Sequence, residues 1–354
     1  MFIQPVPVLR REGDRIVILD QTALPFRCEF VTLSDVAAVA HAIRSMQVRG
    51  APLIGATAAY GVALAMARSG AGDEALAAAL ARLGATRPTA VNLHWALARL
   101  ENCLRPLPAA TRAEAAWAEA EAICTEDAAT CAAIGEHGLQ LFTQLAAQRT
   151  RPLRVMTHCN AGWVATCGAG TALAPVYAAH QAGIALEVLV SETRPRNQGL
   201  LTAWELAQAE VPYQLIADNA AGLLLQRGEV DVVITGADRI AANGDSANKV
   251  GTYLKALAAQ AHGVPFYIAA PQSTLDFACA SGAEIVIEDR GSEELCLLNG
   301  LNEDGKPATL RQAAAGTPAL NPAFDVTPAA LIKAIITERG CIAPAELQAA
   351  YASA

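Results

Sequence analysis

The chain has 354 residues, longer than most domains with a single core, so we expect two domains or one large α/β unit with an added subdomain. Hydrophobic residues make up 53% of the chain and charged residues 17%, which excludes a disordered protein. The 34 Asp and Glu residues outnumber the 26 Lys and Arg residues, giving a net charge of −8. Nucleic-acid-binding proteins carry the opposite sign, so the sequence argues against a DNA or RNA partner.

The sequence also indicates a cytoplasmic location. The first fifteen residues place prolines and charges where a signal peptide needs an apolar core. The most apolar segment, residues 51–67, is interrupted by glycine, threonine and tyrosine, so we predict a buried helix rather than a membrane span. Nine cysteines without a Cys-x-x-Cys pair fit neither a disulfide framework nor a zinc site, and reduced thiols are the simplest account.

The first 150 residues are predicted to form a largely helical domain with short strands at its start. Short strands are expected within residues 15–33, where Pro25 interrupts them. Ser34 and Asp35 offer an N-cap for a first helix, because apolar residues recur at helical spacing after them. Further helices are predicted at residues 52–68, 74–83, 90–103 and along the alanine-rich segment 111–148.

Residues 151–354 show a different pattern, in which strand-like apolar runs alternate with segments of helical length. This alternation predicts an α/β domain with a mainly parallel sheet covered by helices on both faces. Ligands of such sheets bind outside the carboxyl ends of the strands. The predicted strands are residues 153–158, 185–191, 213–217, 230–235, 266–270 and 284–287.

Four of the predicted strands end in polar and glycine-rich segments. Asn, Asp and Gly are common turn residues, so each ending alone could be ordinary turn chemistry. Four endings in one sheet would converge on one crevice, which favours a polar binding site. The segments are residues 157–162, 192–199, 218–219 and 236–239.

Three further features suggest phosphate binding. The glycine-rich run 167–173 resembles a dinucleotide fingerprint, but Leu173 stands where the third glycine belongs, so we expect a turn that presents amides to a phosphate rather than a nicotinamide site. Arg49 and Arg87 each precede a predicted helix, and a guanidinium beside a helix N-terminus can hold a phosphate. The alternative for both arginines is a solvent-exposed side chain on a loop that binds no phosphate.

Cys159 and Asp238 are the candidate catalytic groups. Both follow predicted strands beside glycine, where a thiolate can be exposed to ligand and a carboxyl group between apolar residues can act as an acid near neutral pH. The other cysteines are interpreted as small core residues. We interpret His158 and His94 as structural.

In combination, these segments resemble the methylthioribose-1-phosphate isomerases, which belong to the family that includes the alpha, beta and delta regulatory subunits of translation initiation factor 2B. The resemblance extends from residues 18–22 to the C-terminal helix and so covers nearly the whole chain. The segments that carry it are residues 49–52 (RGAP), 86–93 (TRPTAVNL), 157–162 (THCNAG), 192–195 (ETRP), 236–239 (GADR), 248–252 (NKVGT) and 322–328 (PAFDVTP).

The resemblance implies a helical N-terminal domain, a Rossmann-like C-terminal domain and a homodimer. It also implies an aldose–ketose isomerisation in methionine salvage that uses no cofactor and no metal. Cys159 matches the family's proton-transferring cysteine and Asp238 its catalytic aspartate. The positions that match its substrate-binding residues are Arg49, Gly50, Ala51, Arg87, Gln198, Asn248 and Lys249.

Two other functions stay open at this point. A non-catalytic regulatory subunit with the same fold would have no reason to keep both Cys159 and Asp238. An isomerase for 5-deoxyribose 1-phosphate or ribose 1,5-bisphosphate would keep both residues, and its site would differ where the C5 end of the sugar binds. The sequence also leaves open whether hydrogen moves from C2 to C1 as a proton, through a phosphoenolate, or as a hydride.

Overall fold

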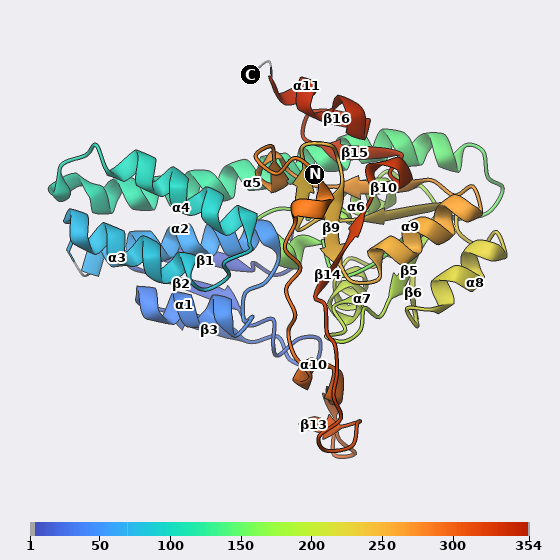
Figure 1. The fold of residues 1–354 in the computed structure, drawn as a ribbon, viewed down its shortest axis with the longest axis horizontal. Coiled ribbons are helices and arrows are strands. Elements are labelled where there is room, and N and C mark those ends of the chain that lie inside the picture. The colour runs from blue at the N-terminus through green and yellow to red at the C-terminus, as the bar shows by residue number, and fades with distance from the viewer. Residues whose placement is uncertain (1–3, 69, 353–354) are drawn as a thin grey trace.

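The computed structural model describes residues 4–68 and 70–352, and its first part is largely helical (Figure 1). Three antiparallel strands in the order β1-β2-β3 open this part, and helices α1 to α5 follow. The elements are β1 Leu9–Glu12, β2 Arg15–Leu19, β3 Phe30–Leu33, α1 Val36–Arg44, α2 Ala51–Arg68, α3 Asp73–Gly84, α4 Val91–Leu104 and α5 Ala109–Ala146.

The predicted helices that became α2 to α5 are confirmed to within two residues at each end, and the predicted start of α1 near Ser34 is confirmed to within two residues. The N-cap of α1 is Asp35, whose Oδ1 accepts a hydrogen bond of 2.8 Å from the amide of Ala38. The alanine-rich segment forms the single helix α5 of 38 residues. Strand β1 was not predicted.

Helix α2 is the centre of the helical part, and α1, α3, α4 and α5 all pack against it. Its glycines allow this close packing, because a Cβ atom at Gly55 would lie 2.8 Å from the carbonyl oxygen of Asn92. Contrary to our expectation from the sequence, α2 is long and apolar enough to cross a membrane by length and composition. It is nonetheless a core helix, because 78% of its residues are buried inside the protein, and the prediction of a buried helix is confirmed.

The second part is built on a seven-stranded sheet with the order β16-β15-β10-β7-β4-β5-β6. Neighbouring strands run parallel except β15 and β16, so the predicted mainly parallel sheet is confirmed. The strands are β4 Leu153–Thr157, β5 Leu186–Ser191, β6 Tyr213–Ile216, β7 Val232–Thr235, β10 Phe266–Ala269, β15 Ala334–Thr337 and β16 Gly340–Ile342.

Helices cover both faces of this sheet, as predicted. Alternate strand residues enter separate apolar clusters: Val155 packs in the cluster that includes residues of α5, α6 and α7, and Met156 in the cluster that includes residues of α8, α9 and α11. These helices are α6 Ala174–Gln181, α7 Gly199–Gln208, α8 Ala220–Gln226, α9 Thr252–Ala261 and α11 Leu347–Ala352.

The predicted strand at residues 284–287 is wrong. The apolar run Ile285, Val286 and Ile287 belongs to a segment in which Ile285 is buried and Val286 is 72% exposed, and this segment pairs with no strand of the seven-stranded sheet. The place beside β10 is taken instead by β15, where Ile335 lies opposite Ile268 in parallel register.

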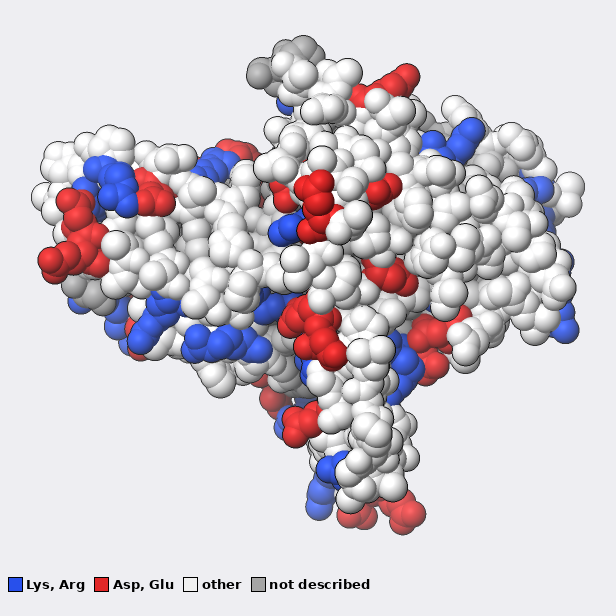
Figure 2. All heavy atoms as spheres, viewed as in Figure 1, with Lys and Arg blue, Asp and Glu red and all other residues white. Residues whose placement is uncertain are grey.

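A smaller sheet and a hairpin complete the second part. The four-stranded sheet has the order β11-β8-β9-β14, and the hairpin of β12 and β13 projects from the body at the bottom of Figure 1. On the face seen in Figure 2, basic and acidic side chains are interspersed. These elements are β8 Arg239–Ala241, β9 Ser246–Lys249, β11 Leu275–Asp276, α10 Glu293–Cys296, β12 Leu297–Leu301, β13 Pro307–Arg311 and β14 Phe324–Thr327.

The two parts share one apolar core, which includes Leu64 of α2 and Val155 of β4. Helix α5 joins them by packing against α6, and a Cβ atom at Gly138 would lie 2.2 Å from Cγ of Pro175. We keep the division of the chain into domains at residues 1–150 and 151–354 as a proposal.

We predict that Gly138→Ala lowers the free energy of unfolding by about 1–3 kcal/mol, because the added methyl group meets the rigid ring of Pro175. Gly222→Ala in α8 is the matched control. It also replaces a helical glycine by alanine, but the added Cβ atom meets nothing within 4 Å, so it should not lower the free energy of unfolding. Urea unfolding followed by circular dichroism measures both. Equal stability of the Gly138 variant and the parent chain would show that the α5–α6 contact is not tight.

Candidate active site

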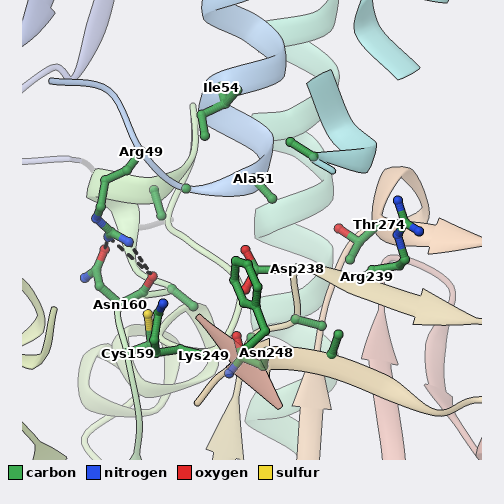
Figure 3. Close-up of a pocket in the computed structure, with 18 of the residues that line it drawn as sticks. Arg49, Ala51, Ile54, Cys159, Asn160, Asp238, Arg239, Asn248, Lys249 and Thr274 are labelled. Atoms are coloured by element: carbon green, nitrogen blue, oxygen red, sulfur yellow. Dashed lines mark hydrogen bonds between the residues drawn. The ribbon is translucent and has the colours of Figure 1, made fainter. Parts of the chain in front are cut away.

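Cys159 and Asp238 face one cavity from neighbouring strand ends (Figure 3). Val155 of β4 pairs in parallel with Val232 of β7, so the carboxyl ends of these strands lie side by side. Cys159 follows β4 by two residues and Asp238 follows β7 by three. The position of the cavity, outside the carboxyl ends of parallel strands, is where α/β sheets bind their ligands.

All nine residues predicted to form the site line this cavity. They come from both parts of the chain: the loop before α2, the loop before α4, the turns after β4 and β7, the start of α7 and the end of β9. The structure thus brings together segments nearly 200 residues apart in the sequence. The residues are Arg49, Gly50, Ala51, Arg87, Cys159, Gln198, Asp238, Asn248 and Lys249.

Gly50 lets the loop before α2 approach the turn after β4. Its φ of 95° lies in the left-handed region, and a Cβ atom there would lie 2.5 Å from the backbone of Ala165. Ala51 then begins α2, an 18-residue helix, so the first amides of this helix open at the cavity beside Arg49. A helix N-terminus with an adjacent guanidinium suits an anion.

Arg49 is held by Asn160 of the turn after β4 (Figure 3). Its Nη2 donates to Asn160 Oδ1, and Nη1 and Nη2 both lie 3.4 Å from the Asn160 carbonyl oxygen. Nε of Arg49 is buried without a hydrogen-bond partner among the residues described, as is Oε1 of Gln198 across the cavity. Unsatisfied buried polar atoms that line a cavity indicate a polar ligand.

Whereas Arg49 is half-buried, Lys249 is buried, with only 4% of its surface exposed. Its Nζ donates to the carbonyl oxygen of Ala323 at 2.6 Å and lies 4.7 Å from the ring centroid of Phe324. Burial, together with the nearby Arg290, lowers the pKa of Lys249 to about 8. Asn248 beside it is also buried, and its amide donates to Thr252 Oγ1 at 3.0 Å.

Three further cations at the cavity are paired with carboxylates. Arg87 and Arg290 share Glu288, at 3.9 and 3.2 Å, and Arg239 lies 3.7 Å from Asp276. By contrast, no carboxylate of the described residues lies within salt-bridge distance of Arg49 or Lys249. Arg49 and Lys249 are therefore the cations of the cavity whose charge is least compensated by a nearby carboxylate.

Burial raises the pKa of the Asp238 carboxyl group, against the opposing effect of Lys249 and the surrounding arginines. Its backbone amide donates to the carbonyl oxygen of Ala247 at 2.9 Å, which fixes the turn after β7. Within residues 4–68 and 70–352, no hydrogen bond occupies the carboxyl oxygens. An accessible carboxyl group with a raised pKa can deliver a proton to a ligand.

Cys159 is presented to the cavity by a backbone bend, with a φ of 66°. Its amide donates to Thr193 Oγ1 at 2.8 Å, and its carbonyl oxygen accepts from Thr202 Oγ1 at 2.8 Å. Burial raises the pKa of the Cys159 thiol, and the nearby Arg49 and Lys249 act in the opposite direction. The thiol is thus held in place and can exchange its proton beside two cations.

Three sequence expectations are corrected. Cys28 and Cys341 are exposed, so not all of the other cysteines are core residues. The ending at residues 218–219 does not reach the cavity, because Asp218 binds the turn after β5 by accepting from Ser191 Oγ and from the amide of Thr193 at 2.8 Å. The glycine-rich run is no phosphate cradle: the amides of Gly168 and Gly170 donate to Thr166 Oγ1 at 3.2 and 3.0 Å.

His158 lines the cavity but acts as a structural residue, as we interpreted it. Its Nε2 lies 2.8 Å from the carbonyl oxygen of Val250, and burial lowers the pKa of the imidazole to about 3, so the ring is neutral. His94 lies outside the lining, with Nε2 3.0 Å from the carbonyl oxygen of Pro88.

Sequence reasoning missed several residues that line the cavity. Residues 285–287, Arg290 and Phe324 line it together with Ile54 of α2. Phe324 lies in one of the segments that carry the family resemblance, whereas no motif in the sequence singles out Arg290. Residues 285–287 had a signal, but their apolar run was interpreted as a strand.

No group of three His, Cys, Asp or Glu side chains suited to a metal ion occurs within residues 4–68 and 70–352.

The family model for the Initiation factor 2 subunit family matches residues 47–344. Methylthioribose-1-phosphate isomerase from Dechloromonas aromatica (strain RCB) is 64% identical over 338 residues, which cover 95% of this chain and 93% of that protein. The protein of the same name from Acidiphilium cryptum (strain JF-5) is 57% identical over 339 residues, covering 95% of this chain and 92% of that protein.

Two solved structures are similar over nearly the whole chain. The 5-methylthioribose 1-phosphate isomerase from Pyrococcus horikoshii OT3 is 38% identical with a TM-score of 0.84, covering 98% of this chain and 96% of that one. Translation initiation factor eIF-2B subunit delta from A. fulgidus is 36% identical with a TM-score of 0.79, covering 97% of both chains.

The chain therefore belongs to the Initiation factor 2 subunit family. The expected α/β fold, with a helical first part and a Rossmann-like, mainly parallel sheet in the second, is confirmed. Within the family it is an enzyme of the isomerase class, as its identity to the relatives of that name shows.

We predict that sulfate, a dianion at all relevant pH values, binds the cavity with an affinity that falls as the pH rises through about 8. The cause is the lowered pKa of Lys249, whose ammonium group loses its proton there and with it the attraction for the anion. Lys249→Met should weaken sulfate binding at pH 7 by about tenfold or more and reduce this pH dependence. Calorimetric titrations at pH 7 and 9.5 measure both effects.

Lys306→Met, in the exposed turn of the β12–β13 hairpin, is the control and should bind sulfate like the parent chain. An affinity of the parent chain that stays constant between these pH values would contradict the role of Lys249.

Proposed function

We propose that this chain converts 5-methylthioribose 1-phosphate to 5-methylthioribulose 1-phosphate, an aldose–ketose isomerisation in methionine salvage. The observation that carries the proposal is the placement of an acid, Asp238, and a thiol, Cys159, at neighbouring strand ends around a cavity with two uncompensated cations. The names of the relatives support the same reaction.

The substrate explains why an acid is needed. A phosphate on C1 locks the sugar as a cyclic acetal, so the ring cannot open spontaneously to an aldehyde. Protonation of the ring oxygen weakens its bond to C1, and opening leaves positive charge on C1. Asp238 suits this step, because its raised pKa keeps a proton on the carboxyl group closer to neutral pH.

Cys159 then transfers the proton between carbons. As a thiolate it removes the proton from C2, giving a phosphoenolate, and returns that proton to C1 while the C2 hydroxyl proton restores the acid form of Asp238. Arg49 and Lys249 favour the thiolate electrostatically, as does positive charge on the opened sugar. A direct hydride shift from C2 to C1 is the competing route, and it would leave this thiol without a proton to carry.

The lining residues that we propose to bind the substrate form a polar set and an apolar set. In the polar set, Arg49, Lys249 and the backbone amides of Gly50 and Ala51 at the start of α2 would hold the phosphate for positioning rather than for cleavage, and Arg87, Gln198 and Asn248 are the further substrate-binding residues. The apolar set would contact the methylthio group at C5, and it consists of Ile54, Ile285, Val286, Ile287 and Phe324.

The charges of the cavity favour one phosphate over two. Arg87, Arg290 and Arg239 already lie beside carboxylates, so a second phosphate would have to displace Glu288 or Asp276 or stay without a full partner. Burying a dianion without such a partner is costly. Ribose 1,5-bisphosphate is therefore the weaker candidate, whereas 5-deoxyribose 1-phosphate differs only at the apolar end.

Three further parts of the proposal follow the family resemblance. The reaction proceeds without a cofactor, because acid–base groups alone balance it. The protein acts as a homodimer, and it works in the cytoplasm, where reduced thiols are stable.

We predict that Asp238→Asn and Cys159→Ser each lower kcat by at least about 10²-fold, the scale of one general acid or base, while the fold persists. The amide can no longer donate the proton to the ring oxygen, and the serine hydroxyl is a far weaker acid than the thiol. Turnover of 5-methylthioribose 1-phosphate and circular dichroism of each purified variant measure these effects.

Cys341→Ser is the matched control, because Cys341 is an exposed cysteine outside the cavity, and it should keep the activity of the parent chain. Near-normal turnover by a folded Asp238 or Cys159 variant would remove that residue from the mechanism.

A further inference from the structure

Two half-buried cysteines touch each other outside the cavity, where α5 meets the loop of residues 166–170, called here the Gly168 loop. Cys124 lies in α5 and Cys167 in this loop. Their Sγ atoms lie 3.4 Å apart, and the thiol of Cys167 donates to the sulfur of Cys124. A cysteine that only fills the core is fully buried, as Cys131 of α5 is. The two thiols in contact are instead both partly open to solvent.

The packing of two backbones keeps these sulfur atoms together. A Cβ atom at Gly168 would lie 2.8 Å from Cα of Ala128 and 2.8 Å from Cβ of Cys131, so the loop lies directly on α5. The amide of Cys167 also donates to Oδ2 of Asp127 at 2.7 Å. The position of Cys167 beside α5 therefore does not depend on the contact between the thiols.

This arrangement is close to that of a disulfide. The two sulfur atoms of a disulfide are about 2.05 Å apart, so each sulfur of this pair would have to move by less than about 1 Å. Small rotations of the two side chains supply such a movement, because the sulfur atoms already face each other.

We propose that a hydroperoxide oxidises Cys124 and Cys167 to a reversible disulfide, which braces α5 against the Gly168 loop. In the first step the Cys124 thiolate attacks one oxygen of hydrogen peroxide, the O–O bond breaks, hydroxide leaves, and Cys124 becomes a sulfenic acid. In the second step the sulfur of Cys167 attacks the sulfenic sulfur. The S–S bond forms, the S–O bond breaks, and the departing hydroxide takes the Cys167 proton as water. Overall, two thiols lose two electrons and two protons, and the peroxide is reduced to two molecules of water.

The hydrogen bond between the thiols sets the order of these steps. Cys167 is the donor, and this hydrogen bond, together with burial, raises the pKa of the Cys167 thiol well above its usual value. Cys167 therefore keeps its proton until the second step. Cys124, whose sulfur accepts the hydrogen bond, is the sulfur that attacks the peroxide.

A bond at this place would join the two parts of the chain beside the cavity. Cys124 belongs to the helical part, and Cys167 follows the turn in which Ala165 meets Gly50. Thr166 lines the cavity, whereas neither Cys124 nor Cys167 does, so the disulfide would stabilise the fold without touching the site. The two cysteines are 43 positions apart in the sequence, and a cross-link over such a long loop restricts the unfolded chain strongly.

The first test maps the disulfide by mass spectrometry. The reduced protein is treated with an equimolar amount of hydrogen peroxide, the remaining thiols are blocked with N-ethylmaleimide, and the denatured protein is digested with glutamyl endopeptidase and chymotrypsin. Cleavage after Glu126 separates Cys124 from Cys131, and cleavage after Trp163 separates Cys167 from the cysteine before it. We expect a linked pair of peptides that joins Cys124 to Cys167 and that dithiothreitol separates. A link from Cys167 to Cys131, or no link to Cys167 once the peroxide is consumed, would overturn the proposal.

Single variants test the pairing. Cys124→Ala and Cys167→Ala should each abolish the link, and two variants keep the test open should one of them fail to fold. Cys103→Ala is the matched control, because Cys103 of α4 is also half-buried, and this variant should form the link like the parent chain. Links that form in either variant of the pair, through another cysteine, would contradict the pairing.

Dimedone, which reacts with sulfenic acids, tests the order of attack. In Cys167→Ala the sulfenic acid on Cys124 has no thiol to meet, so dimedone should label Cys124 after peroxide treatment. In Cys124→Ala it should leave Cys167 unlabelled. Labelling of Cys167 without labelling of Cys124 would overturn the proposed order.

Thermal unfolding tests whether the disulfide braces the fold. The oxidised parent chain should unfold about 2–6 °C above the reduced one, and this difference should vanish in Cys124→Ala. An unfolding temperature that stays the same or falls, in protein that carries the disulfide by mass, would overturn the bracing role. None of these measurements uses turnover, so their outcome is independent of the proposed function.

Discussion

The close approach of two backbones, at Gly50 and Ala165, is the constraint on which the site depends. It brings the loop before α2, from the helical part of the chain, against the turn after β4 of the parallel sheet. Only a glycine fits there, both in conformation and in space. Because of this contact, Arg49 and the start of α2 share one cavity with Cys159 and Asp238, which come from the sheet.

The same arrangement determines which groups of the cavity are charged and which are neutral. Among the described residues, the half-buried Arg49 and the buried Lys249 have no carboxylate partner, so both can bind an anion, whereas burial raises the pKa of both Asp238 and Cys159 and favours their neutral forms. A bound phosphate would satisfy the two cations at once. Arg49 is held in turn by Asn160, whose Oδ1 accepts a hydrogen bond from Nη2 of Arg49.

Local sequence patterns predicted most of the helices and strands, whereas features that depend on long-range contacts could not be predicted from such patterns. Helical periodicity located α2 to α5 within two residues, and the polar strand endings located Cys159 and Asp238 at one edge of the sheet. Strand β15 was missed because its place in the sheet depends on a long-range pairing, in which Ile335 lies opposite Ile268. Residues 285–287 were misread as a strand because an apolar run also suits a segment that lines the cavity. The contact of Cys124 with Cys167 could not be recognised either, since 43 positions separate them in the sequence and only the fold brings them together.

One cavity, with a single phosphate site and apolar lining residues for the C5 group, is proposed to isomerise 5-methylthioribose 1-phosphate. The most direct measurement compares kcat/KM for this sugar, 5-deoxyribose 1-phosphate and ribose 1,5-bisphosphate. The methylthio sugar should be best, and the deoxy sugar should follow within about 10- to 200-fold, because apolar pockets discriminate weakly between apolar groups of different size. The bisphosphate should be far poorer than both. A bisphosphate that proves the best substrate would contradict the substrate assignment, and a folded protein that converts none of the three would contradict the isomerisation itself.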